Sequence, residues 1–198
     1  MKKKILTYFL FSVFLTLNFN HVLSIEPDVF VQSTVNRASK ILSDNLPKQE
    51  KINRLKLIAK ETVFLKKIGS YSLGSYRKTL TKDQKVEYLF LFEKYFLKSF
   101  SSRLSEWTNP EIEVISKKII NKNYTMVNSA LKGTNKRPEV KIDWRIYTKD
   151  PENPLIVDVV IEGLSLARTQ REEFSSILNS NDGDINALFR TLEEFSKN

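Results

Sequence analysis

Residues 140–178 constrain the fold more than any other part of the chain. The alternation of apolar and polar residues in V-K-I-D-W-R-I-Y-T-K predicts one strand, and a turn containing two prolines leads to a second, L-I-V-D-V-V-I-E-G-L-S-L. The second strand is apolar on both faces over much of its length and leaves through Gly163 and Leu164 into a helix. A strand of this kind must be covered twice, by helices or by a bound apolar ligand.

The first 24 residues have the features of a secretory signal peptide. Lys2, Lys3 and Lys4 form a basic start, residues 5–19 are mostly apolar, and Ser24 ends a suitable cleavage site. The apolar run is shorter than the ~20 residues that cross a membrane comfortably, although an uncleaved anchor is the alternative. We therefore expect residues 1–24 to be removed and residues 25–198 to form a single lipid-binding domain, for the reasons given below.

The chain lacks most of the residues that carry out catalysis and bind metals. It contains no Cys, and its one His, His21, lies in the predicted signal peptide. Zinc and copper sites of the usual kind, Ser-His and Cys-His nucleophiles and the commonest general base are thereby excluded from the mature chain. We predict no metal, no cofactor and no enzymatic activity.

Basic residues exceed acidic ones. The net charge is +9, and removal of the three lysines of the signal peptide lowers it to +6. In an exported protein this excess suggests contact with an anionic membrane surface or an acidic partner rather than with nucleic acid. A compositional bias toward Lys, Asn, Ile and Phe is the alternative explanation.

Apolar spacing divides the chain into helices and strands. Helical spacing predicts helices over residues 28–46, 48–65, 82–102, 169–179 and 185–195, with a Gly-punctuated helical segment before residue 82. A period of two predicts strands over residues 111–118, 124–131, 140–149 and 155–166. The expected fold class is α+β, with N-terminal helices packed on a twisted, mainly antiparallel four-stranded sheet and with C-terminal helices.

The helix over residues 82–102 is unusually apolar. Thr81 and Gln84 form a capping box at its start. Its apolar and aromatic side chains cover roughly 220–260° of the helical wheel, whereas a surface helix needs a stripe of only about 100°. Two sides of this helix must therefore be shielded from water, one by the sheet and the other by a second helix or a lipid. A central core helix is the alternative.

Three carboxylates, Asp143, Asp158 and Glu162, are the candidates for a hydrolase, the enzymatic alternative. On one extended strand Asp158 and Glu162 would be about 13 Å apart, which is too far for an ordinary pair in glycoside cleavage. Ser165 lacks both the second Gly of a nucleophile elbow and a His to activate it. These residues therefore give little support to a catalytic site.

Three segments together resemble a known family. They are I-G-S-Y-S-L-G-S-Y-R-K-T-L-T-K-D-Q-K-V-E-Y-L-F-L-F-E-K-Y-F (68–96), V-K-I-D-W (140–144) and D-V-V-I-E-G-L-S-L with the helix that follows (158–178). With these segments the chain resembles the MlaC-type periplasmic phospholipid-binding proteins, also known as toluene-tolerance or ABC-transporter auxiliary proteins. None of the shared motifs is catalytic, so the resemblance indicates a fold and a carrier role.

The resemblance implies an α+β domain whose sheet and helices enclose an apolar cavity for phospholipid tails. It also implies a periplasmic carrier that shuttles phospholipid between an outer-membrane lipoprotein complex and an inner-membrane ABC transporter complex. A non-ligand-binding envelope adaptor is the alternative function.

The helix and strand patterns supply candidate residues for the cavity wall, and plain core packing is the alternative role for each. These lipid-binding candidates are Leu73, Tyr88, Phe92, Phe96, Trp144, Ile146, Val160 and Leu164. Arg145 or Arg77 could meet a phosphate at the mouth of the cavity.

Overall fold

The computed structural model describes residues 24–135 and 137–197, so the predicted signal peptide lies, apart from Ser24, outside the described residues. The described chain forms, in order, α1 (Pro27–Ser43), α2 (Lys48–Thr62), α3 (Leu65–Ser72), the short 3-10 helix η1 (Tyr76–Lys78), α4 (Lys82–Ser105), β1 (Ile112–Asn121), β2 (Tyr124–Leu131), β3 (Val140–Tyr147), β4 (Leu155–Ile161), β5 (Leu164–Ser165), α5 (Leu166–Asn179) and α6 (Ile185–Lys197). The predicted order of helices and strands is confirmed.

The sheet is antiparallel, with the strands in sequence order from β1 to β5. It has five strands rather than the expected four. Glu162 and Gly163 have φ angles of 49° and 84°, and they turn the chain back so that Leu164 pairs with Ile161. Positive φ is easy for Gly and uncommon for other residues. The strand predicted over residues 155–166 is therefore interrupted by this turn.

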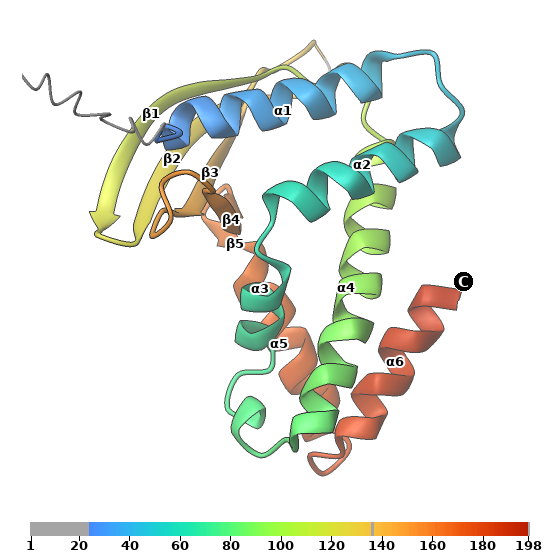
Figure 1. The fold of residues 1–198 in the computed structure, drawn as a ribbon. Helices are drawn as coiled ribbons and strands as arrows, with labels where there is room; N and C mark the ends of the chain where they lie inside the picture. Colours follow the sequence, from blue (N-terminus) through green and yellow to red (C-terminus); the bar gives the residue numbers. More distant parts are fainter. Residues whose placement is uncertain (1–23, 136, 198) are drawn as a thin grey trace, which may run out of the picture.

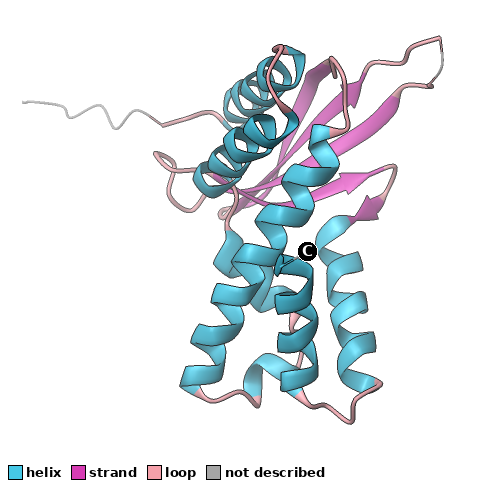
Figure 2. Cartoon of the chain, turned by 90° about the vertical axis from the view of Figure 1, so that its right-hand side faces the viewer, coloured by secondary structure: helices cyan, strands magenta, loops and turns pink. Residues whose placement is uncertain are grey.

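The molecule has a sheet layer and a helical bundle. In Figure 1, α1 packs along the sheet, α2 lies beneath α1 at the upper part of α4, and α3, α4, α5 and α6 form the bundle below. In Figure 2, turned by 90°, α1 and α2 lie on one side of the sheet and the bundle extends below it. Ile146 of β3 belongs to the core cluster and Trp144 packs against it, together with the buried side chains of α4.

A side-chain amide joins α1 to the edge of the sheet. The Nε2 atom of Gln32 donates to the carbonyl of Ile112 at 3.2 Å, and the N–H of Val114 donates to Oε1 of Gln32 at 2.9 Å. The Gln32 amide thus occupies the place of a neighbouring strand along the start of β1. Satisfying these edge groups also fixes the position of α1 on the sheet.

An aromatic ladder runs along one side of α4. Its members recur every four residues: Tyr88, Phe92, Phe96 and Phe100. Consecutive ring centroids are 5.6 to 5.9 Å apart, as expected for side chains spaced i, i+4 on a helix. Phe174 of α5 meets Tyr88 and Phe92 edge-on, at 6.4 and 6.2 Å. This contact joins α5 to the lower half of α4.

The opposite side of α4 is also covered, by α2 and α6. Leu91 and Leu97 are buried there. Tyr95 lies between the two sides, and its ring packs against Phe195 of α6 at 4.9 Å and against Phe174 of α5 at 5.8 Å. The expectation of two shielded sides is thus confirmed for the middle of α4. Near its start, however, Val86 and Phe90 are 70% and 58% exposed. The capping box of Thr81 and Gln84 is present as predicted.

The double cover expected for β4 is only partial. One face meets the helices through Ile156 and Val159, and on the other face the start of α5 covers Asp158. Beyond Asp158, Val160 and Ile161 pair with β5 and stay half-buried. The second face of β4 is therefore covered only in part, by β5 and the start of α5, and not by a second layer of helices.

Within the part of the chain that the structure describes, no helix combines the length and the apolar character needed to cross a membrane.

Gly69 allows α3 to approach α4 closely. A Cβ atom at this position would lie 2.8 Å from Cδ1 of the buried Phe92 ring, nearer than real Cβ contacts come. The hydroxyl of Tyr88 donates to the carbonyl of Gly69 at 3.0 Å and holds the two helices together at the same level. The packing of α3 thus requires the smallest side chain here.

We expect Gly69→Ala to lower the free energy of unfolding by about 1–3 kcal/mol, because the added methyl group overpacks the Phe92 contact. Urea denaturation followed by circular dichroism measures this change. Ser70→Ala, at an exposed position on the same helix, is the matched control and should stay within about 0.5 kcal/mol of wild type. A Gly69→Ala protein as stable as the control would show that the Phe92 ring moves aside freely.

Candidate functional site

An apolar pocket lies where the helical bundle meets the sheet. It has a volume of about 170 Å³ and opens between the second half of α4, the first turns of α5, and strands β3 and β4. Its apolar wall is formed by Val63, Ile68, Phe96, Phe100, Trp144, Ile156, Val159, Leu166 and Ala167. Polar side chains stand at other points of the lining: Ser99, Arg103, Thr169, Gln170 and Glu173. A mostly apolar wall with few polar groups suits an apolar ligand.

The aromatic ladder explains why the pocket lies at this level. Phe174 contacts the two lower rings, Tyr88 and Phe92, which are each only 1% exposed. The two upper rings, Phe96 and Phe100, stay half-buried and line the pocket. The pocket therefore begins where the ring of Phe174 no longer reaches the ladder.

Trp144 forms the opposite wall in a fixed orientation. Its Nε1 donates to Oγ of Ser129 at 2.9 Å, and that hydroxyl donates to the carbonyl of Ile142 at 2.9 Å. The polar edge of the indole is thereby satisfied by β2 and β3. The rest of the ring remains as apolar surface for the pocket.

Asp158 joins β4 to the start of α5. Its carboxylate accepts from Oγ of Ser165 at 2.7 Å and from the backbone N–H of Ala167 at 3.0 Å, and the residue is 5% exposed. Ser165 in turn accepts from the N–H of Arg168 as the N-cap of α5. A negative charge at a helix N-terminus is favourable, because the free N–H groups carry partial positive charge. Asp158 thus sets the position of the α5 wall.

Tyr95 lines the pocket as a neutral hydrogen-bond donor. Its hydroxyl donates to Oε1 of Gln170 on α5 at 3.1 Å. Burial raises the pKa of Tyr95, and it raises the pKa of Tyr88 still further. Both phenols therefore stay uncharged at neutral pH, and neither places a negative charge beside the apolar wall.

The structure places the predicted lipid-binding residues in three settings. Phe96 and Trp144 line the pocket. Four others are buried in the core that surrounds it: Leu73, Tyr88, Phe92 and Ile146. Val160 is half-buried and Leu164 is 58% exposed, and both lie where β4 pairs with β5 beside the start of α5. The role of all eight in binding stays a prediction.

Several lining residues were not among those predicted. Phe100 follows Phe96 by one helical step of four, and Val159 pairs with Trp144 across the strands, so both could have been found from spacing. Leu166 and Gln170 reach the pocket only because α5 turns back beside β4. No periodic pattern in the sequence marks those two.

The three carboxylates considered for a hydrolase have separate structural contacts. Asp143 accepts from Nδ2 of Asn128 at 2.7 Å and pairs with Lys141, and Glu162 accepts from the N–H of Lys141 in the exposed turn. Of the three, Asp158 alone lines the pocket, where it is bonded to α5. The two phosphate candidates also differ: Arg77 is exposed on η1, whereas Arg145 lines a second hollow next to the pocket.

That second hollow, about 310 Å³ in volume, shares Ile68, Asp158 and Ala167 with the apolar pocket. We call it the rim hollow. Its other lining residues are Lys67, Tyr71, Ile120, Asn121, Tyr124, Arg145 and Val157. These shared residues place the apolar pocket next to a hollow that carries two cationic side chains, Lys67 and Arg145.

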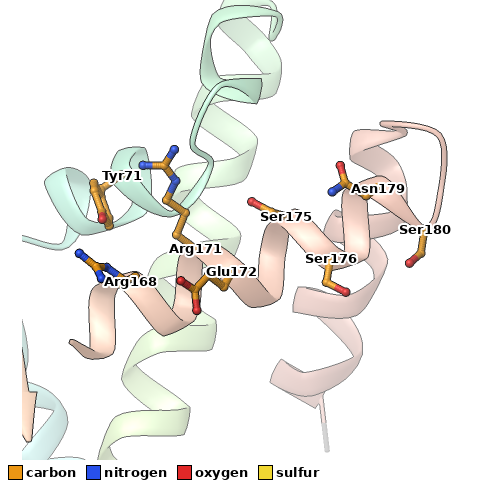
Figure 3. Close-up of a pocket in the computed structure, with 8 residues that line it drawn as sticks. All are labelled: Tyr71, Arg168, Arg171, Glu172, Ser175, Ser176, Asn179 and Ser180. Carbon is orange, nitrogen blue, oxygen red and sulfur yellow. The ribbon is translucent and has the colours of Figure 1, made fainter. Parts of the chain in front are cut away.

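A third and wider hollow lies on the outside of α5 (Figure 3). Its volume is about 840 Å³, and Arg168 and Arg171 extend from α5 toward Tyr71 of α3. The guanidinium carbon of Arg171 is 5.3 Å from the centre of the Tyr71 ring. Ser175, Ser176, Asn179 and Ser180 complete a polar floor. This surface is too polar and too open to hold acyl chains.

The family of the chain follows from comparison with known proteins. The model of the MlaC protein family matches residues 32–194, so the chain belongs to the MlaC family. This membership confirms the resemblance found in the sequence. Comparison with curated protein sequences gives no significant match.

A solved structure has the same fold. It is a phospholipid-binding protein from Ralstonia solanacearum, determined in complex with a phospholipid. The TM-score is 0.72 at 17% sequence identity, and the match covers 87% of this chain and 98% of the other. At this identity the similarity establishes the α+β fold, and the ligand is a property of the Ralstonia protein.

We expect Asp158→Ala to lower the free energy of unfolding by about 2–4 kcal/mol, because the buried N–H of Ala167 and the partly buried hydroxyl of Ser165 lose their acceptor. Asp158→Asn is the matched variant and keeps one oxygen for the N–H of Ala167, so we expect about half that loss. Urea denaturation of the three proteins measures the difference. Equal stability of Asp158→Ala and wild type would contradict the assigned link between β4 and α5.

Proposed function

We propose that this protein is a periplasmic phospholipid carrier. It takes up glycerophospholipids by their tails and passes them, unaltered, between an outer-membrane lipoprotein complex and an inner-membrane ABC transporter complex. The observation that carries the proposal is the apolar pocket between α4, α5 and the sheet, in a chain that belongs to the MlaC family. The transporter and lipoprotein partners come from the resemblance of the chain to that family.

A carrier of this kind needs an apolar enclosure more than it needs chemistry. Exposure to water costs about 0.8 kcal/mol per methylene group, so two tails with roughly 30 methylenes cost on the order of 20 kcal/mol. A cavity as apolar as the bilayer makes transfer nearly neutral. Such a transfer requires no nucleophile or metal, in agreement with a mature chain that lacks His and Cys.

The pocket must widen to hold a lipid. Its volume of about 170 Å³ is close to that of an engineered cavity of about 150 Å³ that accepts benzene. The walls belong to separate elements, which can move apart. The turn before α5 offers a pivot, because Gly163 has a φ of 84° and no atom lies within 4 Å of where its Cβ would be. Rotation of α5 away from β4 would lengthen the pocket along Trp144 and Phe96.

The eight predicted residues take different parts in this proposal. Phe96 and Trp144 contact the tails directly, and Leu73, Tyr88, Phe92 and Ile146 back the wall and meet the tails as the pocket widens. Val160 and Leu164 stand at the outer edge beside Leu166, where a lipid would enter.

An envelope adaptor without a ligand is the second candidate function. It is favoured by exposed apolar side chains among lysines on α2 and α4: Leu57, Val86 and Phe90 are 58–70% exposed. Exposed apolar side chains of this kind offer contact area that a protein partner could cover. The adaptor needs no pocket, so measurement of bound lipid separates the two functions.

Mass spectrometry of organic extracts from gently purified, periplasmically expressed protein tests the carrier. We expect glycerophospholipids in amounts comparable with the protein, because tails held in the pocket cannot leave into water. A periplasmic protein of similar size, purified in parallel, controls for lipid carried over from membranes. Extracts without phospholipid above that control would favour the adaptor.

Blocking the pocket tests where the lipid lies. We expect Thr169→Trp, which fills the pocket from α5, to lower retained lipid at least roughly tenfold, equivalent to about 1.4 kcal/mol of binding. Val86→Trp adds the same ring at a position on α4 that is 70% exposed, and it should retain lipid as wild type does. Circular dichroism confirms that both variants fold. Full lipid retention by a folded Thr169→Trp protein would place the ligand elsewhere.

A further inference from the structure

The rim hollow contains a lysine held by aromatic rings. Nζ of Lys67 lies 4.2, 5.3 and 5.6 Å from the ring centres of Tyr147, Tyr124 and Phe64. Tyr147 packs against the other two rings at 5.5 and 5.4 Å, so the three form one group. Cation–π attraction holds an ammonium in place but leaves its charge intact. The ammonium is thus positioned without being neutralised.

No ion pair involves Lys67 among residues 24–135 and 137–197. Among the residues that line the rim hollow, Asp158 is the one acid, and both of its oxygens already accept hydrogen bonds, from Ser165 and Ala167. A lysine that lacks a carboxylate partner and lies in a concave site can bind an external anion.

Arg145 supplies a second cation to the same hollow. It lies two residues before Tyr147 on β3, and therefore on the same face of the sheet. Its Nη1 is 4.0 Å from Oδ2 of Asp158, which is beyond hydrogen-bond distance. Because this contact uses none of its N–H groups, the guanidinium can bind an anion with two parallel hydrogen bonds.

The surroundings add to the positive potential. Tyr71 separates the rim hollow from the wider hollow of Figure 3, where Arg168 and Arg171 are accompanied by one acid, Glu172. Four cationic side chains therefore stand around Tyr71: Lys67, Arg145, Arg168 and Arg171. Apolar material lies directly behind them, since Ile68 and Ala167 belong to both the rim hollow and the apolar pocket.

We propose that the rim hollow is a phosphate site, in which Lys67 and Arg145 bind the phosphate of a glycerophospholipid whose tails occupy the apolar pocket. This proposal rests on the carrier function above and adds to it a requirement for the phosphate group. Tyr147, Tyr124 and Phe64 act as positioning residues that keep the Lys67 ammonium at the hollow. Uncharged diacylglycerol has the same tails but lacks the anion, so it should bind less tightly.

Fluorescence of Trp144 provides the measurement. Trp107→Phe leaves Trp144, which lines the apolar pocket, as the only Trp in the chain. Delipidated protein with this change is titrated with dihexanoyl-phosphatidylglycerol and with dihexanoylglycerol, which have the same tails and differ in the phosphoglycerol headgroup. We expect the phospholipid to bind at least roughly tenfold more tightly, a difference of about 1.4 kcal/mol.

Substitution of the lysine assigns that difference to the rim hollow. We expect Lys67→Met to weaken phosphatidylglycerol binding roughly tenfold and to leave dihexanoylglycerol binding unchanged, and Arg145→Met to act in the same direction. Lys66→Met is the matched control, because Lys66 is exposed on the same helix and does not line the rim hollow. Lys67→Arg keeps a cation over the rings and should retain the headgroup preference.

The other outcomes are distinguishable. Equal weakening of both lipids by Lys67→Met, or no weakening of either, would overturn the phosphate site but leave the carrier function intact. Absence of binding of either lipid to the parent protein would overturn both.

Inorganic phosphate separates a lipid headgroup from a free anion. We expect it to compete with phosphatidylglycerol, but not with dihexanoylglycerol, and to lose this effect in Lys67→Met. Phosphate that binds at Lys67 without displacing phosphatidylglycerol would assign the hollow to a free anion and overturn the proposal.

Discussion

The rest of the structure depends on the aromatic ladder of α4. Four rings spaced by four residues must project from one side of a helix, and they present more apolar surface than one neighbouring helix covers. Phe174 of α5 covers Tyr88 and Phe92 edge-on, and the sheet approaches the two rings above them. The space left beside Phe96 and Phe100 is the apolar pocket. The buried core therefore forms around the lower rings of the ladder, and the candidate binding pocket forms beside the upper rings.

Polar contacts define the walls of this pocket without making it polar. Asp158 bonds the start of α5 to β4, and Ser129 satisfies the indole N–H of Trp144. The carboxylate of Asp158 and the indole N–H of Trp144 thus have partners, and most of the residues that line the pocket are apolar. Lys67 and Arg145 stand next to this pocket, at the rim hollow. This separation of an apolar interior from a cationic rim matches the chemistry of an amphipathic ligand with a phosphate group.

Much of the fold could be predicted from the sequence, whereas the site could be predicted only in part. β2 was predicted with its observed bounds of Tyr124–Leu131, and the capping box at Thr81 correctly marks the start of α4. The break in the strand after Ile161 was missed, since Glu162 is a non-Gly residue with positive φ in an otherwise apolar run. Phe96 and Trp144 reach the pocket, but so do Leu166 and Gln170, which their own periodicity does not single out.

The sequence by itself determined the order of the helices and strands, the over-wide apolar face of α4 and membership of the MlaC family, since these follow from local periodicity and from motifs. The tertiary structure alone decided which apolar residues are core and which line the pocket. Periodicity places a side chain on a face of its own element, but it does not say how far a neighbouring element extends over that face. Here the reach of Phe174 and the turn at Gly163 make that division, and both depend on contacts between residues far apart in the chain.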